Sequence, residues 1–295
     1  MAKALELRRR IRSVQSTRQI TRTMEMVSTS KLKRAQDRVV GARPYARALA
    51  DVLGELYDPE LADRFPLLRQ PAGAARRVAL LLVTSNRGLC GGFNANLIRA
   101  ARHRAQELEA QGTQVDLHLV GKKGVTFFRF AKRAVASSRI DIGDRPTATH
   151  AAELVEPLMG AFEAGALDAV EVVFASFNSA VSTPPTTLRV LPVAPPAGGP
   201  MDPHGQRQSA YFILKPSAEA ILERLLPLYV RNQVYRALVE TAAAEHGARR
   251  TAMKNATDNA GEMLDTLRRT FNRARQAQIT QEIAEIVGGA EALQG

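Results

Sequence analysis

"AEHGARRTAMKNATDNA" occupies residues 244–260 and has the composition of a helix, yet its one large apolar side chain is Met253. Alanine recurs at every fourth position, at Ala244, Ala248, Ala252, Ala256 and Ala260. Residues four apart lie on the same side of a helix, so the segment presents a narrow row of methyl groups. The row drifts by ~40° per step against 3.6 residues per turn, as a coiled partner requires. The segment therefore predicts a second helix packed very close to this one.

The N-terminal segment is the partner that we expect for this row. Residues 1–40 contain no glycine and no proline, and their apolar residues recur at helical spacing. Two groups of three have this spacing: Leu7, Ile11 and Val14, then Ile20, Met24 and Val27. The groups lie on different sides of a straight helix, which is typical of a helix that winds around another. We expect the second group to lie across the alanines, and Gly41 and Pro44 to mark a break or bend.

A second long helical pattern covers residues 217–287. At ~1.5 Å per residue this segment would be roughly 100 Å long. Pro227 predicts a kink or restart, and Gly288-Gly289 predicts a stop. Isolated helices gain little stability without tertiary packing, so the two long segments are expected to pair, antiparallel to each other.

The middle of the chain has the pattern of an α/β domain. Apolar runs of strand length alternate with helical stretches at about 94–109 and 150–165, which implies a mostly parallel sheet. The expected strands are VALLLVT (78–84), VDLHLVG (115–121), VEVVFASF (170–177) and a possible edge strand, TTLRVLPV (186–193), with AVASSRI (134–140) following GVTFFRFA. The predicted organisation is an N-terminal coiled-coil helix, a Rossmann-like α/β domain, a surface loop and a C-terminal coiled-coil helix: 1–57, 76–193, 194–208 and 209–295.

The net charge of +12 is unevenly distributed. Residues 1–40 hold eleven Lys and Arg against three acidic residues, a net of +8, whereas residues 217–295 hold ten of each sign. This imbalance favours an acidic partner near the N-terminal helix. A basic coiled-coil protein that binds nucleic acid is the alternative, and its binding would depend steeply on salt. The arginines lie on several faces without interleaved aromatics, which favours a protein partner.

Neither a membrane span nor a disulfide is expected. The longest apolar run, VALLLV, is far shorter than the roughly 18–20 residues that cross a bilayer. The single cysteine, Cys90, excludes an internal disulfide and suggests a reducing compartment. The arginine-rich N-terminus has the composition of an organelle targeting peptide, but its pattern continues past residue 38. We therefore expect a protein that is made and kept in the cytosol.

No pattern for covalent chemistry stands out. RGLCGG (87–92) follows a strand, where a phosphate loop would lie, but it matches neither phosphate-binding signature and reads better as a tight turn. The five histidines are scattered, and there is no metal-binding spacing. We expect no catalytic residue, no metal and no cofactor. An α/β enzyme with a phosphate site at this turn remains an alternative, and it requires nucleotide binding by the isolated chain.

Three long motifs, in order and in register, identify a family. They are IRSVQSTRQITRTMEMVSTSKLKRAQ near the N-terminus, TSNRGLCGGFN in the centre, and AMKNATDNAGEMLDTL followed by NRARQAQITQEIAEIVGGAEAL. Together they closely resemble the γ subunit of F-type ATP synthases, across essentially the whole chain. The resemblance implies a rotor rather than a catalyst: an antiparallel coiled coil inside a ring of three α and three β subunits, and an α/β domain at the foot of the stalk. The implied partners at the foot are the ε subunit and the c-ring, with no nucleic acid.

The resemblance also implies a mechanism and a location. Proton flow turns the c-ring and the γ subunit, which holds each catalytic β subunit in a different conformation in turn. The complex would lie at the cytoplasmic face of the bacterial inner membrane, with this chain peripheral to it. The implied β-subunit contacts are Arg87, Cys90, Arg99, Arg102, Arg275, Gln276 and Thr280. The implied coupling and shaft positions are Met24, Ala248, Ala252 and Ala256, and the implied apolar bearing tip is Ile283, Ile286 and Val287.

Several positions depart from the family pattern. Asn86 stands where aspartate is frequent, Arg250 where methionine is common, and Lys215 where some relatives carry glutamate. Leu214 and Lys215 are the implied foot contact with the c-ring or the ε subunit. The chloroplast form carries an insert with two extra cysteines, so regulation by thiol chemistry is not expected here.

Overall fold

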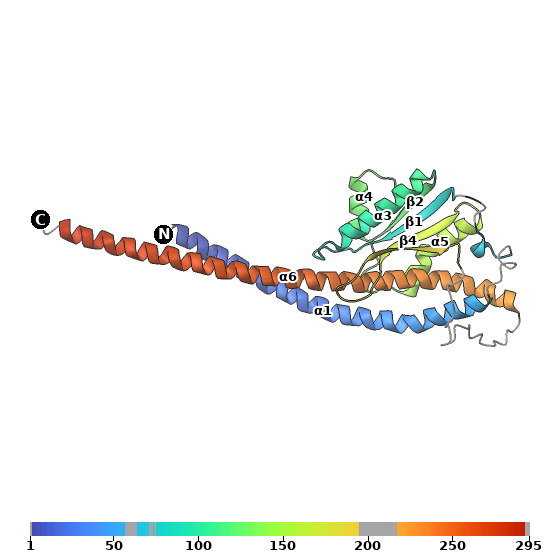
Figure 1. The fold of residues 1–295 in the computed structure, drawn as a ribbon, viewed down its shortest axis with the longest axis horizontal. Coiled ribbons are helices and arrows are strands. Elements are labelled where there is room, and N and C mark those ends of the chain that lie inside the picture. The colour runs from blue at the N-terminus through green and yellow to red at the C-terminus, as the bar shows by residue number, and fades with distance from the viewer. Residues whose placement is uncertain (1, 57–63, 71–72, 74, 195–216, 293–295) are drawn as a thin grey trace, which may run out of the picture. The chain divides into compact units, whose positions relative to one another are not determined.

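The computed structural model describes residues 2–56, 64–70, 73, 75–194 and 217–292. They form two compact units: unit 1 runs to Ser28 and resumes at Arg249, and unit 2 runs from Thr29 to Ala248. Figure 1 traces the elements in chain order. These are α1 (Ala2–Leu56), η1 (Pro66–Leu68), β1 (Arg77–Val83), α3 (Phe93–Ala110), β2 (Gln114–Val120), α4 (Lys122–Phe130), β3 (Ser137–Arg139), α5 (Ala148–Glu163), β4 (Ala169–Ala175), β5 (Pro185–Leu191) and α6 (Ala218–Ala292).

Unit 1 is a pair of antiparallel helices. The Thr257 hydroxyl of α6 lies 2.8 Å from the Thr21 hydroxyl of α1, and the Arg18 guanidinium lies beside Gly261. The numbers of the contacting residues add up to nearly the same value in both pairs, as expected for antiparallel helices that advance residue for residue. The described part of α1 begins at Ala2, which in this register lies opposite residue 276 of α6.

The contact line between the two helices follows a seven-residue repeat. Residues that are at least partly buried recur at spacings of mostly three, four or seven on α1 and of four and three on α6. In unit 1 they include Leu7, Ile11, Val14, Thr21, Met24 and Ser28, facing Met253, Thr257, Ala260, Leu264, Leu267 and Phe271. A repeat of seven against 3.6 residues per turn produces a left-handed coiled coil. The predicted coiled coil is confirmed, and none of the five alanines of the opening stretch is exposed.

The predicted partners of the alanine row are wrong in part. Ile20 is 57% exposed and Val27 is 51% exposed, while Met24 is only partly buried. The buried positions are instead Thr21 and Ser28, whose hydroxyls donate to main-chain oxygens of the preceding turn at 3.0 and 2.7 Å. Because these hydroxyls are satisfied within α1, their small side chains can be buried at little cost and allow close approach. The hydrophobic pattern was therefore wrong at Ile20 and Val27, whereas Leu7, Ile11 and Val14 of the first group are all partly buried.

The expected helix breaks are also wrong. Pro44 lies inside α1, Pro227 lies inside α6, and α6 continues through Gly288-Gly289 to Ala292. An interior proline costs ~3 kcal/mol and an interior glycine ~1 kcal/mol relative to alanine. Buried leucines near each proline, Leu49 after Pro44 and Leu226 before Pro227, provide packing that offsets such local costs.

Unit 2 contains a five-stranded sheet in the order β3-β2-β1-β4-β5. The pairs β3–β2, β2–β1 and β1–β4 are parallel, and only the edge strand β5 is antiparallel. The mostly parallel sheet is thus confirmed. The central strands β1 and β4 are buried on both sides and, apart from Arg77 at the start of β1 and Glu171 in β4, consist of apolar residues, as the hydrophobic pattern predicted.

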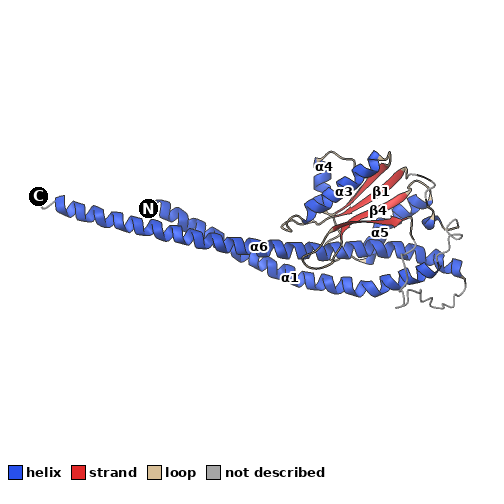
Figure 2. Cartoon of the chain, viewed as in Figure 1, coloured by secondary structure: helices blue, strands red, loops and turns tan. Residues whose placement is uncertain are grey.

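Helices cover both faces of this sheet (Figure 2). Alternate residues of β1 separate two cores: Leu81 packs in the core that includes α5 and η1, and Leu80 packs in the core that includes α3 and α4. Within unit 2, α6 contributes to both cores, through Leu222–Leu238 to the first and Val239–Ala244 to the second. The α4 segment, GVTFFRFA, had no predicted structure from its sequence.

Polar contacts also fasten the sheet to α6 in unit 2. The Glu240 carboxylate accepts from the Phe177 N–H at 3.0 Å, and the Thr241 hydroxyl accepts from the Ala175 N–H at 3.3 Å. Gly247 lies so close to the β4–β5 loop that a Cβ there would be 3.1 Å from the Ala180 carbonyl oxygen. Glu240, Thr241 and Gly247 of α6 thus hold the end of β4 and the loop that follows it.

Candidate functional site

The loop after β1, residues 84–92, is held from α3. Asn94 accepts from the Ser85 N–H at 3.0 Å and donates to the Ser85 hydroxyl at 2.8 Å. The Ser85 hydroxyl in turn donates to the Arg87 carbonyl at 2.6 Å. Leu89 adopts a left-handed conformation with φ 62°. The turn is fixed internally, which leaves its outer residues displayed on a rigid support.

Asn86 ties the same loop to two further segments. Its amide donates to the carbonyl oxygens of Ile140 and Ile142, both at 2.9 Å, and its oxygen accepts from the Lys122 N–H at 2.8 Å. An aspartate here would direct carboxylate oxygens at two carbonyl oxygens, because a carboxylate has no donor. The departure from the family pattern at Asn86 therefore has a local reason: this chain needs an amide at that position.

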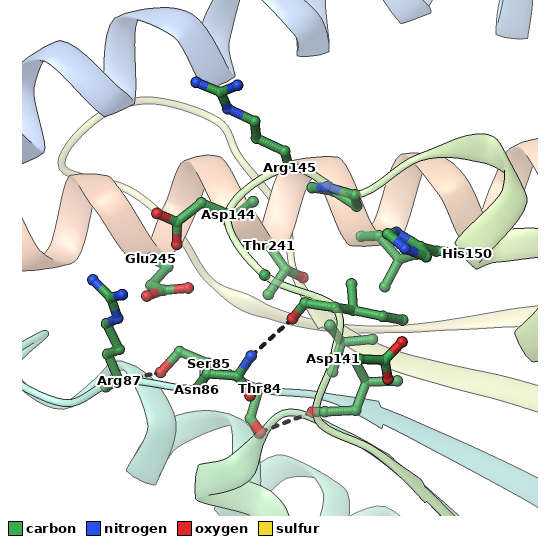
Figure 3. A pocket seen from close by; sticks show the side chains of 17 residues that line it. Thr84, Ser85, Asn86, Arg87, Asp141, Asp144, Arg145, His150, Thr241 and Glu245 are labelled. Atoms are coloured by element: carbon green, nitrogen blue, oxygen red, sulfur yellow. Dashed lines mark hydrogen bonds between the residues drawn. The ribbon is translucent and has the colours of Figure 1, made fainter.

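A polar pocket of about 520 Å³ opens beside this loop, at the carboxyl ends of β1 and β2 (Figure 3). Figure 3 shows Arg87 rising toward Asp144 and Glu245. Asp144 is paired with Lys31 of α1, and the ring of the buried His246 lies 3.9 Å from its carboxylate. Burial acts to raise the pKa of Asp144, but the Lys31 hydrogen bond and neighbouring positive charges lower it below its ordinary value.

This pocket occupies the place where doubly wound sheets bind ligands, yet its charges do not favour a phosphate. Its lining holds three carboxylates, Asp141, Asp144 and Glu245, against two arginines, Arg87 and Arg145, a balance that does not favour an anion. Among the described residues there is no group of three His, Cys, Asp or Glu side chains that could hold a metal ion. The pocket is better explained as the junction where the loop, α1 and α6 meet within unit 2.

The predicted contact residues near this loop differ in accessibility. Arg87, Arg99 and Arg102 are exposed, whereas Cys90 is only 2% exposed and its sulfur accepts from the Asn94 amide. The loop's apolar surface is instead provided by Leu89, which is 61% exposed. Sequence reasoning missed Leu89, although an apolar residue between Gly88 and Cys90 at the tip of a glycine-rich turn was a usable signal.

The predicted contacts on the C-terminal helix lie together in unit 1. Arg275, Gln276 and Thr280 are exposed, and the Thr280 hydroxyl donates to the Gln276 carbonyl one turn earlier. Beyond them the tip of α6 (residues 279–289) is exposed throughout. Its apolar side chains and exposed fractions are Ile279 46%, Ile283 56%, Ile286 72% and Val287 54%.

The predicted coupling positions are accessible only in part, and the predicted foot contact falls outside the described residues. Met24, Ala248, Ala252 and Ala256 are all partly buried. Leu214 and Lys215 lie outside the described residues. No helix in the described part of the chain is long and apolar enough to cross a membrane.

Comparison with known sequences identifies relatives over the full length of the chain. A family model described as ATP synthase matches residues 3–293. The ATP synthase gamma chain of Gemmatimonas aurantiaca is 65% identical over 295 residues, which covers 100% of both chains. The ATP synthase gamma chain of Moorella thermoacetica is 46% identical over 299 residues, which covers 99% of this chain and 100% of the relative.

Solved structures have the same fold. A chain in the Euglena gracilis mitochondrial ATP synthase (OSCP, F1 and c-ring) has a TM-score of 0.69 at 19% identity, covering 99% of this chain and 95% of that chain. A chain in the central stalk and c-ring of the Tetrahymena thermophila enzyme has a TM-score of 0.61 at 22% identity, covering 80% of this chain and 99% of that chain. With the long helices, the mostly parallel sheet and the full-length sequence relatives in agreement, the chain belongs to the ATP synthase gamma chain family.

Proposed function

We propose that this gamma chain is the central-stalk rotor of a proton-translocating ATP synthase and has no catalytic site of its own. It couples rotation of the c-ring to conformational cycling of the catalytic β subunits. The observation that carries the proposal is the tip of α6, a single helix that is exposed on every side and ends in apolar residues. An exposed apolar helix end favours a surrounding sleeve of other subunits.

The mechanism follows from the asymmetry of the shaft. The two helices of unit 1 expose different side chains: α1 exposes basic residues together with Ile20 and Val27, and α6 exposes mainly polar and charged residues before its apolar tip. A β subunit that meets one face is favoured in the conformation that fits that face, and rotation brings each face to each subunit in turn. Arg275, Gln276 and Thr280 are the proposed contacts on the shaft. Hydrolysis of ATP would drive the same cycle in reverse.

A second set of contacts is proposed on the α/β domain. Arg87 on the rigid loop and Arg99 and Arg102 on α3 are exposed and positively charged, which suits an acidic segment of a β subunit. Cys90 belongs to this set as a buried residue of the same loop rather than through an exposed thiol. The foot contact with the ε subunit and the c-ring is proposed for Leu214 and Lys215.

The proposed location is the cytoplasmic face of the bacterial inner membrane. The chain would be peripheral there and held by its partners, the α and β subunits of the catalytic hexamer, the ε subunit and the c-ring. This location is an inference from the family, since membrane attachment through partners needs no span in the chain itself.

Assembly and coupling can be tested separately. Purified α and β subunits are expected to form an active hexameric ATPase only when this chain is added; full assembly without it contradicts the proposal.

In vesicles that contain the whole synthase, replacing Arg87, Arg99 and Arg102 together with glutamine should lower proton pumping per ATP hydrolysed. Single replacements should have small effects, because exposed charge pairs each contribute little.

A matched control uses three exposed arginines elsewhere in unit 2: Arg43, Arg47 and Arg224. Their replacement removes the same charge but should leave the pumping ratio unchanged. Equal losses from the two triple variants would mean that net charge, rather than this surface, supports coupling.

A further inference from the structure

The loop between β3 and α5 (residues 140–147) contacts three other parts of unit 2, and the proposed rotor contacts do not explain it. The Ile142 side chain is 7% exposed and packs in the core that includes α5. At the other end of the loop, the Thr147 hydroxyl accepts from the His150 N–H at 3.3 Å and caps α5. Both ends of the loop are therefore fixed, and Asp144 lies between them.

Asp144 joins this loop to both long helices. Its carboxylate forms an ion pair with Lys31 of α1, and its carbonyl oxygen accepts from the Arg38 guanidinium at 3.4 Å. Lys31 and Arg38 are seven residues apart, so they project from the same face of α1. The Nε2 atom of the buried His246 of α6 lies 3.9 Å from the other carboxylate oxygen. One residue of the α/β domain is thus contacted from α1 and from α6.

The same loop is joined to the loop after β1. The Asn86 amide donates to the carbonyl oxygens of Ile140 and Ile142, both at 2.9 Å. The next residue is Arg87, the proposed β-subunit contact on that loop, which points toward Asp144 in Figure 3. A continuous series of polar contacts therefore runs from α1 through Asp144 and Asn86 to the residue beside Asn86 that is displayed at the surface.

These polar contacts add direction to the packing of α1 on the α/β domain. Leu32, Ala35 and Val39 of α1 pack in the core that includes α3 and α4. Apolar burial is non-directional, whereas ion pairs and hydrogen bonds depend on distance and angle. The Lys31 and Asp144 side chains are 32% and 33% exposed, so their pair contributes little to stability. Its effect is therefore expected in the position of α1 rather than in the free energy of unfolding.

We infer that Asp144 is a positioning residue for coupling: paired with Lys31, it holds the loop after β1 against α1, so that force on Arg87 reaches the shaft helix. The inference deepens the proposed rotor function and rests on it. The competing explanation is an ion pair that only stabilises the fold. A positioning residue affects coupling in every assembled complex, whereas a stabilising pair affects only how much complex assembles.

Neutral variants in the whole synthase test the inference. In sealed vesicles, Asp144→Asn and Lys31→Gln should each lower proton pumping per ATP hydrolysed by about twofold or more, the lower end of the effects of residues on a coupling path. Hydrolysis of ATP should continue. The double variant should lose no more than either single variant, because the two residues act as one pair. Lys31→Arg keeps the charge and should preserve the pumping ratio.

The ion pair between Lys33 and Asp37 is a matched control. It joins the same two residue types at 3.3 Å, and its side chains are 75% and 62% exposed. Both residues belong to α1, so this pair does not join α1 to a loop of the α/β domain. Lys33→Gln and Asp37→Asn should therefore leave the pumping ratio unchanged.

Torque measured on single synthase molecules separates positioning from stability. Every rotating molecule is folded and assembled, so a variant that only destabilises the fold gives fewer rotating molecules with wild-type torque. Asp144→Asn should instead lower the torque against a viscous load. Copurification with the other subunits checks the assembly of each variant, and Lys31→Gln provides the same measurement if Asp144→Asn does not assemble.

A combined variant tests the route. Asp144→Asn should cause no further loss of pumping when Arg87, Arg99 and Arg102 are already replaced with glutamine, because Asp144 acts through the surface to which these arginines belong. A further loss would mean that Asp144 affects coupling by another route, and it would overturn the inference.

The remaining outcomes distinguish the inference from the proposed function. If the wild-type chain does not copurify with other synthase subunits, the proposed function fails and the inference fails with it. If the wild-type complex pumps protons but Asp144→Asn and Lys31→Gln keep its pumping ratio and torque, only the inference is overturned. Equal losses from the Lys33 and Asp37 variants overturn it as well.

Discussion

Glu171 is a carboxylate in the middle of β4, where every other residue is apolar, and it is 2% exposed. Arg104 of α3 donates to it at 2.7 and 2.8 Å, and Arg189 of β5 donates at 2.9 Å. A buried carboxylate with fewer partners would be costly, and here both of its oxygens are occupied. This residue fastens α3, the helix that carries Arg99 and Arg102, to the sheet behind it.

Replacing Glu171 with glutamine should lower the free energy of unfolding by about 1–3 kcal/mol. Removing one partner from a fully buried ion pair lowers the free energy of unfolding by more than this. Here the loss is smaller because the partners left behind, Arg104 and Arg189, are partly exposed and remain partly solvated. Chemical denaturation of the isolated chain measures the change. Glu223→Gln, on an exposed face of α6, is the control and should change stability very little.

The pH dependence of this effect has a definite sign. Burial acts to raise the pKa of Glu171, but the hydrogen bonds and charges of Arg104 and Arg189 lower it below its ordinary value of 4.5. Its contribution is therefore fully present above pH 4.5 and is lost as the pH falls through the lower pKa of the folded state. The stability difference between wild type and Glu171→Gln should narrow only below pH 4.5; narrowing between pH 7 and 5 would contradict this assignment.

At the scale of elements, the paired helices of unit 1 depend on small residues. Ala260 is 8% exposed in a contact line that also contains Thr21 and Thr257, hydrogen-bonded to each other at 2.8 Å. This line favours close approach rather than a large buried apolar area. Stability at such a site is limited by space, so added volume should be destabilising.

Ala260→Leu tests this packing against Ala277→Leu, which lies on an exposed position of the same helix. The first should destabilise unit 1 by about 1–3 kcal/mol through overpacking. The second adds the same volume and retains helix propensity, so its effect should stay within about 0.5 kcal/mol. Helix content followed during denaturation distinguishes them, and a stabilised Ala260→Leu would show that the contact line has unused space.

The same elements show how far the sequence alone could predict the fold. VALLLV and VEVVF identified β1 and β4 because parallel strands buried on both faces need continuous apolar runs. The contact line of α1 was predicted wrongly at Ile20 and Val27. The residues buried there instead, Thr21 and Ser28, are small and polar, and a hydrophobic pattern does not report side-chain size. Cys90 was expected from the family motif to contact a β subunit, but it is 2% exposed and its sulfur accepts from the Asn94 amide of α3, a contact that no pattern within the loop predicts.

At the scale of the whole molecule, the isolated chain exposes apolar surface that the proposed complex would cover. The tip of α6 lies beyond residue 276, where the register of Thr21 with Thr257 leaves no described part of α1 opposite it. Ile283 and Ile286 are 56% and 72% exposed there. Removing such side chains from water stabilises an association, so the isolated gamma chain should self-associate through its tip.

Ile283→Ser combined with Ile286→Ser should weaken this self-association by about tenfold or more, because each fully buried isoleucine contributes roughly 1.5–3 kcal/mol and tenfold corresponds to ~1.4 kcal/mol. The fold should persist, since neither side chain is buried in the isolated chain. Sedimentation velocity over a concentration series measures the effect. Val181→Ser removes an apolar side chain that is 88% exposed in unit 2, and it should leave the association unchanged. If both variants weaken association equally, exposed apolar area in general drives it, and the tip has no special role as a surface that requires a sleeve.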